Sequence, residues 1–583
     1  MTLTLALLLL QAKSPDRPLA GSAEKCGTEI PWLTDMEEAV RESKRTGKPI
    51  FWWVTKVDGS PMDRKLVLLK YMLSGPWMMP DVVSIVTRRF VPLRMDAEGR
   101  LNVRPMRFIE PGFVILDSKL DDILRLDRIT TFQEDHLRSL LLKAAKAPPV
   151  GTTAQELFLE GAYEAALARD PSAGLRASCL RRLGREFRME DLPVEERAFV
   201  LLGKGDPAAA EKTLADGTSD LARYLRGVAM HLQARDDEGR KVWAKLVADR
   251  PESRWAWKAS AELSKDGPFV RGFEVYTSIV EKADVSAALR YLLSMQRSHG
   301  GWDDSNYNFG GDDSLPNVWM AESALVALAL HTWRETDSRI PKALERAEVY
   351  LGDESKIARN DTDEIVWAHV YRLLYYVRTG NQKRAALMIG ELGNLQLKSG
   401  AFAHEYPNPF VTASVLHALG EAKKVGVEVP EGMVKRAADA LKSCRGKKGA
   451  FSYGFPGRGA SVEGAAGRGP VCELGLTLWG ASTNDDLRAA VETSFRHHDL
   501  LERVRKYDDH ADSWRNGGFF FWYDVFARAE AIAHLGDKAA AERLARIIRG
   551  IFEPDGAWVD SHELGRPYGT AMALLSLRRL ESR

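Results

Sequence analysis

The chain has 583 residues, which is too long for one hydrophobic core, so length alone predicts several domains. Hydrophobic residues make up 45% and charged residues 28%, as in ordinary globular proteins. The formal net charge is +1 and no basic patch stands out. A protein that attracts nucleic acid or anionic membranes through its overall charge is therefore excluded.

The first residues, MTLTLALLLLQA, form an apolar run that is too short to span a bilayer as a helix. The run resembles the hydrophobic region of a secretory signal peptide. We therefore expect residues 1–25 to be a signal peptide or a disordered N-terminus. The protein is then exported, either to the periplasm or out of the cell, and a cytoplasmic protein is the alternative. No later segment has the length and apolar character of an integral membrane segment.

Four cysteines are spread widely along the chain, and none belongs to a CxxC pair. This spacing excludes a zinc ribbon and a disulfide-dense scaffold, while one or two disulfides remain compatible with export. The cysteines are Cys26, Cys179, Cys444 and Cys472.

Residues 30–146 alternate between helix and strand patterns. TDMEEAVRESKRTGKP is typical of a helix capped by Thr34 or Asp35 and ended by Gly47, and IFWWVT of a strand buried on both faces. RRFVPLRMD and EPGFVILDS predict two further strands, and a last helix starts at Gln133.

This order resembles a thioredoxin-like domain, with Glu110–Pro111 where that family carries a cis-proline. The family's redox centre is a CxxC motif after the first strand. The matching stretch here, KVDGSPMDRK, has no cysteine. The resemblance therefore implies a binding or structural domain and not a thiol-disulfide oxidoreductase.

Residues 150–265 repeat an alanine-rich helix–turn–helix scheme, as in LLGKGDPAAAEKTLADG. The scheme resembles an array of tetratricopeptide-type (TPR-like) hairpins, and a plain helical linker bundle is the alternative. In either case we expect packing and partner contact in this spacer.

Residues 273–583 carry a repeat in which an apolar helix is followed by glycine, an aromatic residue, a polar loop and another apolar helix. Trp302, Phe402, Phe451 and Trp558 mark it at intervals of one or two units of about fifty residues. Degenerate units near residues 352 and 518 bring the number to six. Six hairpins bury all their apolar flanks if the last meets the first, which predicts a closed double ring. Its inner helices are expected to begin near Asn317, Thr362, Pro409, Gly469, Trp522 and Gly565.

These repeats and the closing DGAW…YGTAMALLSL resemble the α/α toroid of squalene and hopene cyclases, prenyltransferase β-subunits and thioester-containing complement domains. The expected architecture is multi-domain and mainly α: an α/β thioredoxin-like domain, a helical-hairpin spacer and an (α/α)6 toroid. The resemblance leaves the function open, because this terpenoid-cyclase-like fold hosts cyclisation, prenyl transfer and pure binding.

Parallel inner helices collect their N-termini at one pole, where amides and dipoles favour anions or polarised ligands. Polar residues near those starts are candidates for a ligand-binding rim, although helix capping would also explain them individually. The candidates are Asp312, Asp313, Glu322, His369, Cys472, Glu473, Asp524, Arg528, His562, Glu563, Arg566 and Tyr568. Among these, the candidate catalytic acids are Asp313, Asp524 and Glu473.

The motifs that isoprenoid chemistry needs are each incomplete. Class II terpene cyclases use Asp-x-Asp-Asp, but FGGDDSLPN has Gly310 in the first position, and GWDDS offers only Asp303 and Asp304. Prenyltransferases bind zinc through Asp, Cys and His. Cys472 fits that pattern, whereas proline and glycine occupy the other two positions. No glutamine pairs with a cysteine as a thioester requires.

A DDxxD spacing, typical of magnesium-diphosphate binding, occurs at Asp508, Asp509 and Asp512 in a polar loop. We expect a solvated loop there and no cofactor, with zinc at Cys472 or magnesium at this loop as alternatives. The sequence thus predicts a non-catalytic binding or scaffold protein whose partner is a protein or an apolar small molecule. The alternative is an isoprenoid-processing enzyme, of the terpene cyclase or prenyltransferase type, with altered acid or metal residues.

Overall fold

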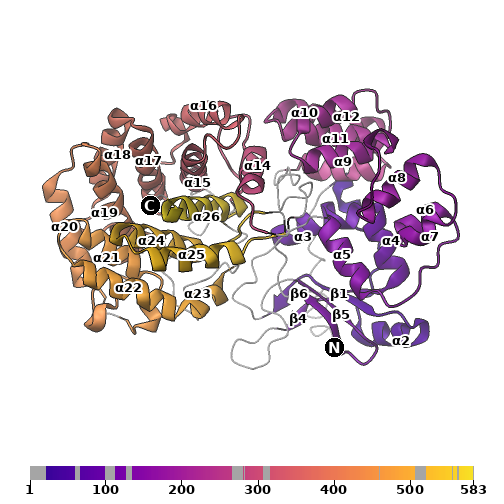
Figure 1. Ribbon diagram of the computed structural model, residues 1–583, viewed down its shortest axis with the longest axis horizontal. Coiled ribbons are helices and arrows are strands. Elements are labelled where there is room, and N and C mark those ends of the chain that lie inside the picture. Colours follow the sequence, from indigo (N-terminus) through magenta and orange to yellow (C-terminus); the bar gives the residue numbers. More distant parts are fainter. Residues whose placement is uncertain are drawn as a thin grey trace, which may run out of the picture. The chain divides into compact units, whose positions relative to one another are not determined.

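The computed structural model describes residues 21–58, 66–98, 112–126, 134–264, 280, 282–305, 307, 315–457, 460–505, 520–554, 556–560 and 564–581. These residues are mainly helical with one four-stranded sheet, in agreement with the predicted fold class at that level. The chain divides into two compact units, residues 1–279 and 280–583 (Figure 1). Among the described helices, none combines the length and the apolar character needed to cross a membrane.

The sheet of the first unit has the strand order β3-β1-β5-β6. β1 (Ile50–Val54) is central, parallel to β3 (Val91–Arg94) and antiparallel to β5 (Gly112–Leu116), which pairs with β6 (Asp122–Leu126). Every residue of β1 is buried, so the prediction of a strand covered on both faces is confirmed. A separate two-stranded ladder joins β2 (Val57–Asp58) and β4 (Ala97–Glu98).

Alternate residues of β1 enter two different cores, as the two-residue period of a strand requires. Phe51 and Trp53 pack with Trp77, whereas Trp52 packs with Leu93 and the helix α2 (Met36–Thr46). The Asp35 side chain caps α2, and Gly47, at a φ of 70°, ends it, as predicted. The other helices beside the sheet are α3 (Leu66–Ser74), α4 (Pro80–Arg89) and α5 (Glu134–Ala144).

The rest of the first unit is a series of short helices in which neighbours along the chain pack on one another, as in a hairpin array. Tyr224, Leu225 and Trp243 of this array share one hydrophobic cluster with Phe51 and Trp77 of the sheet region. The hairpins and the sheet therefore form one folded body. The helices are α6 (Ala154–Leu159), α7 (Tyr163–Leu167), α8 (Ala173–Arg182), α9 (Val194–Gly203), α10 (Pro207–Thr213), α11 (Asp220–His231), α12 (Asp236–Asp249) and α13 (Arg254–Glu262).

Six helices of the second unit pack on one another in a closed order. Each packs on the next in the order α15, α17, α19, α21, α24, α26, and α26 returns to α15. They are buried on nearly every side, as expected of helices enclosed by others. The helices begin within three residues of the predicted starts and are α15 (Leu315–Thr332), α17 (Ile365–Thr379), α19 (Pro409–Lys424), α21 (Gly469–Thr477), α24 (Phe521–Leu535) and α26 (Arg566–Glu581).

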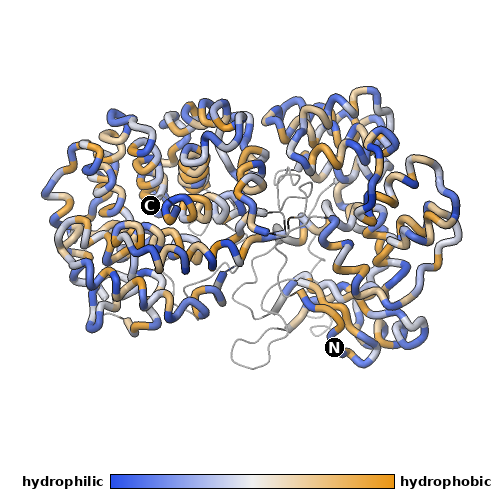
Figure 2. Tube along the Cα trace, viewed as in Figure 1, coloured by the Kyte–Doolittle hydropathy of each residue, from blue (hydrophilic) through white to orange (hydrophobic). Residues whose placement is uncertain are grey.

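The outer helices of this unit are amphipathic and each packs on the inner ring. Figure 2 shows hydrophilic and hydrophobic residues alternating along them, which is typical of helices that cover a core and face solvent. The outer helices are α14 (Val285–Met295), α16 (Ile340–Leu351), α18 (Gln382–Leu395), α20 (Glu431–Ser443), α22 (Asn484–Arg496), α23 (His498–Val504) and α25 (Lys538–Gly550).

The repeated glycine-aromatic step has a structural explanation. The indole N–H groups of Trp302 and Trp558 donate to the carbonyls of Leu292 and Ile548 at the ends of the preceding outer helices. Gly300 adopts a φ of 96°, and a Cβ there would lie 2.2 Å from a backbone carbonyl oxygen. Only glycine fits that approach. The repeat residues therefore have a structural role in building the ring.

Candidate functional site at the start of the inner helices

The segments that lead into the inner helices meet in space. The ring of Tyr307, which precedes α15, lies 6.3 Å from that of His404, which precedes α19. It also lies 5.8 Å from the ring of Phe520, the residue before α24. Helices far apart in the sequence thus present their N-terminal ends to one region, which we call the N-terminal pole.

Packed aromatic rings form the floor of this pole. Trp367 stacks on Tyr371, one turn further along α17, with centroids 5.8 Å apart, and meets Tyr523 of α24 at the same distance. Phe410 of α19 lies 6.4 Å from Tyr523. All four side chains are at most 5% exposed. Aromatic contacts therefore connect α17, α19 and α24 across this floor.

Polar groups line the same floor. Tyr568 of α26 is 5% exposed, and its hydroxyl has no hydrogen-bond partner among the described residues. Burial raises the pKa of Tyr568, and so do neighbouring groups that include Asp524. Burial also raises the pKa of Cys472 well above its ordinary value, so the thiol is neutral at neutral pH. All four cysteines of the chain are free.

Other predicted site residues lie away from this floor. His369 is fully buried, and its pKa is lowered to about 4 by burial and by Arg372, with Glu391 of the outer helix α18 also nearby. Arg528 packs over Phe495 of α22. Arg566 packs over Tyr291 of the outer helix α14. Several predictions concern residues outside the described ranges. They are those for Asp312, Asp313, His562, Glu563, Asp508, Asp509, Asp512, residues 1–20 and Glu110–Pro111.

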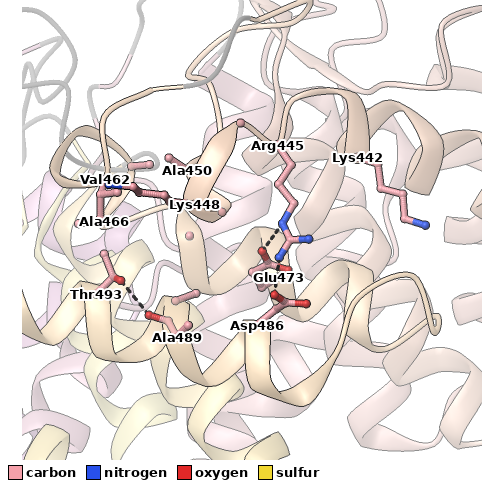
Figure 3. Close-up of a pocket in the computed structure, with 15 residues that line it drawn as sticks. Lys442, Arg445, Lys448, Ala450, Val462, Ala466, Glu473, Asp486, Ala489 and Thr493 are labelled. Carbon is pink, nitrogen blue, oxygen red and sulfur yellow. Dashed lines mark hydrogen bonds and ion pairs between the residues drawn. The ribbon is translucent and has the colours of Figure 1, made fainter.

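Glu473 belongs to a separate pocket of about 590 Å³ (Figure 3). Its carboxylate accepts from Arg445 at 2.7 Å and from the Ser482 hydroxyl at 2.6 Å. The same guanidinium reaches Asp486 at 2.9 Å. The two carboxylates share the one Arg445 guanidinium, and this arrangement joins the segment after α20 to α21 and α22.

A carboxyl pair, Asp304 and Glu322, was not recognised as such from the sequence. The two carboxyl groups lie close together, since a Cβ at residue 565 would lie 2.8 Å from an Asp304 oxygen and 3.2 Å from a Glu322 oxygen. Burial raises the pKa of Asp304 to about 6 and that of Glu322 well above its usual range, so the pair holds a proton near neutral pH. A Cβ at Gly565 would lie 2.8 Å from Asp304, which explains why the polar run before α26 ends in glycine.

Asp560, in the polar run before α26, caps a different helix. Its carboxylate accepts from the backbone N–H of Trp522 at 2.7 Å, in the first turn of α24. Burial raises the pKa of Asp560 to about 7 despite that hydrogen bond. Because Phe520 has no capping side chain of its own, this distant carboxyl satisfies the helix start.

Glu364, His404 and Glu405 form a further cluster at the pole that sequence reasoning missed. Glu364 is the N-cap residue of α17, and His404 and Glu405 belong to the short hairpin of β7 (Ala403–His404) and β8 (Tyr406–Pro407). Their ligating atoms lie within 4.8 Å of one another. The one available signal was the adjacent His-Glu pair just before an inner helix.

Comparison with protein families gives no match, and comparison with curated protein sequences gives none. Among solved structures, a type II terpene cyclase from Scytonema in complex with its substrate, geranylgeranyl dihydroxybenzoate, aligns with 16% identity and a TM-score of 0.33. The alignment covers 51% of this chain and 95% of the cyclase. A likeness at this level carries nothing about activity.

Proposed function

We propose that the second unit is an α/α toroid that binds an apolar ligand with a polar end, or a peptide of that character, at its N-terminal pole without chemical turnover. The buried Tyr568 hydroxyl carries this proposal. A buried polar group costs free energy unless it is hydrogen-bonded, and the described residues offer this hydroxyl no partner. A ligand whose polar end forms a hydrogen bond with Tyr568 would supply the missing partner. Its apolar body would contact the aromatic floor.

We propose a supporting role for the first unit. Its strand order, with β1 parallel to β3 and antiparallel to β5, supports a thioredoxin-like domain without redox cysteines, and the packed helix pairs support a TPR-like array. Such a body offers surface for a protein partner. Export through an N-terminal signal peptide is part of the same proposal.

Binding is tested with the purified full-length protein and geranylgeraniol, an uncharged isoprenoid alcohol, by quenching of tryptophan fluorescence. We expect saturable binding that Tyr568→Phe weakens about tenfold, the cost of one hydrogen bond. Tyr376→Phe is the matched control, because that hydroxyl donates to the carbonyl of Leu351 towards the outer helices. Equal affinities for wild type and Tyr568→Phe would refute the proposal, and the absence of binding would exclude an isoprenoid alcohol as the ligand.

An isoprenoid-processing enzyme is the second candidate, and the Asp304–Glu322 pair favours it. A carboxyl group that keeps its proton at neutral pH can donate that proton to a substrate as a general acid. Incubation with geranylgeraniol and its diphosphate, followed by gas chromatography–mass spectrometry, decides between the candidates. Products that disappear in Glu322→Gln would establish catalysis and overturn the non-catalytic proposal.

A further inference from the structure

Glu364, His404 and Glu405 come from the starts of two neighbouring inner helices and converge on one point. The imidazole Nδ1 of His404 lies 3.2 Å from a Glu364 carboxylate oxygen, and Nε2 lies 3.6 Å from a Glu405 oxygen. The histidine is 4% exposed, and the Glu364 side chain is 2% exposed. One possible ligand atom from each of the three side chains lies within 4.8 Å of the others, with His404 and Glu364 buried and Glu405 20% exposed.

Among the described residues, the charges of the two glutamates are balanced only in part, by His404. Oε1 of Glu364 is buried and has no hydrogen-bond partner among the described residues. Within the described part of the chain, the ion pairs of Glu364 and Glu405 involve His404 alone, with no lysine or arginine. A buried carboxylate without a full set of partners is costly unless a cation neutralises it.

The surrounding side chains hold the imidazole in place. Trp367 packs edge-on against the His404 ring at 6.0 Å, and the Tyr307 hydroxyl lies 3.5 Å from Nε2. Glu405 adopts a φ of 59°, a backbone conformation that glutamate rarely takes, and this turn keeps its carboxylate beside the histidine. Ligands that are fixed before binding lose little entropy when an ion arrives.

We propose that Glu364, His404 and Glu405 bind one divalent transition-metal ion, Zn²⁺ or Mn²⁺, at the N-terminal pole. An imidazole with two carboxylates is a donor set of the kind these ions accept, whereas Mg²⁺ and Ca²⁺ prefer oxygen ligands alone. Three protein ligands leave coordination positions for water or for a polar group of a bound molecule. Cys472 is not among these ligands.

The test uses full-length protein freed of metal with EDTA and titrated with ZnCl₂, MnCl₂ or MgCl₂ by isothermal calorimetry. We expect one equivalent of Zn²⁺ or Mn²⁺ to bind, and to bind more tightly than Mg²⁺. His404→Gln, Glu364→Gln and Glu405→Gln should each weaken binding at least tenfold. The same metal should raise the melting temperature of wild type but not of these variants.

His417→Gln is the matched control, since it alters a second buried histidine beside carboxylates and should leave the affinity unchanged. Circular dichroism of the metal-free variants checks folding. If the variants of the buried residues Glu364 and His404 fail to fold, the metal affinity of Glu405→Gln tests the proposal. Binding that survives both His404→Gln and Glu405→Gln would overturn the proposal. So would the absence of saturable Zn²⁺ and Mn²⁺ binding to wild type, or a preference for Mg²⁺.

Discussion

Two buried clusters of one histidine and two glutamates lie in the same ring, and their surroundings differ. The second cluster is His417, Glu421 and Glu530. Glu421 pairs with Lys424 at 2.6 Å and with Arg378 at 3.2 Å, and Glu530 pairs with Arg579 at 2.9 Å. The cluster of Glu364, His404 and Glu405 has no such cations among the described residues. Composition alone therefore does not define a metal site, because the protein itself supplies the counter-charge in one case.

The helix direction explains this difference. Arg378, Lys424 and Arg579 lie in the last turns of α17, α19 and α26, where basic side chains complement the helix dipole. The C-terminal pole of the ring thus carries its own cations. At the N-terminal pole, in contrast, the ion pairs of Glu364 and Glu405 within the described residues involve His404 alone, so a cation can be added to that cluster.

Removing a cation from the neutralised cluster should have the largest effect. Arg579→Met leaves the buried Glu530 carboxylate without its closest counter-charge, and we expect a loss of about 3–5 kcal/mol in the free energy of unfolding. Urea denaturation measures this. Arg578→Met is the neighbouring control: Arg578 is exposed and packs over Trp333, so its loss should cost about 1 kcal/mol or less. Equal effects of the two substitutions would contradict the interpretation.

The same cluster should govern stability in acid. Burial alone would raise the pKa of Glu530, but His417 and Arg579 hold it at about 2, below the ordinary value of about 4.3. The stabilisation is therefore complete above about pH 5 and is lost as pH falls towards 2, on the order of 3 kcal/mol. Unfolding measured between pH 6 and pH 3 should show a shallower decline for Glu530→Gln than for wild type. Parallel curves would contradict the assigned pKa.

The Asp304–Glu322 pair should act in the opposite direction. Its raised pKa values mean that the native state binds protons more tightly than the unfolded chain. Stability should therefore fall by about 1–3 kcal/mol as pH rises from about 4 through 6 and above. Glu322→Gln removes one of the two charges and should flatten this dependence in melting experiments from pH 5 to pH 8. An unchanged slope would show that the carboxyls do not share a proton.

The sequence predicted the parts of this molecule that periodicity determines. The starts of α19 and α21 at Pro409 and Gly469 are as predicted, and so are the Asp35 cap and the Gly47 end of α2. These features follow from local chemistry: apolar spacing, a capping side chain, and a glycine at positive φ.

The candidate site was much less predictable, because a position near a helix start does not fix the direction of a side chain. His369 and Glu473 lie near predicted helix starts, yet His369 lies close to Glu391 of the outer helix α18 and Glu473 pairs with Arg445, which follows the outer helix α20. Glu364 and His404 are 40 residues apart and meet only through the packing of α17 against α19. Asp304 likewise meets Glu322 through the fold, which supplies a carboxyl partner that no local motif contains.

The smallest expected effect concerns the turn that positions Glu405. In metal-free protein, Glu405→Gly should be about 1 kcal/mol more stable than Glu405→Ala, because glycine adopts a φ of 59° without the steric cost that any Cβ imposes. Chemical denaturation in EDTA compares the two variants, and both lack the carboxylate, so that only the backbone differs. Equal stabilities would mean that the turn relaxes when the glutamate is removed. A higher stability of the glycine variant would show that the native fold keeps a strained residue beside His404. We attribute this strain to the need to hold the Glu405 carboxylate at the N-terminal pole.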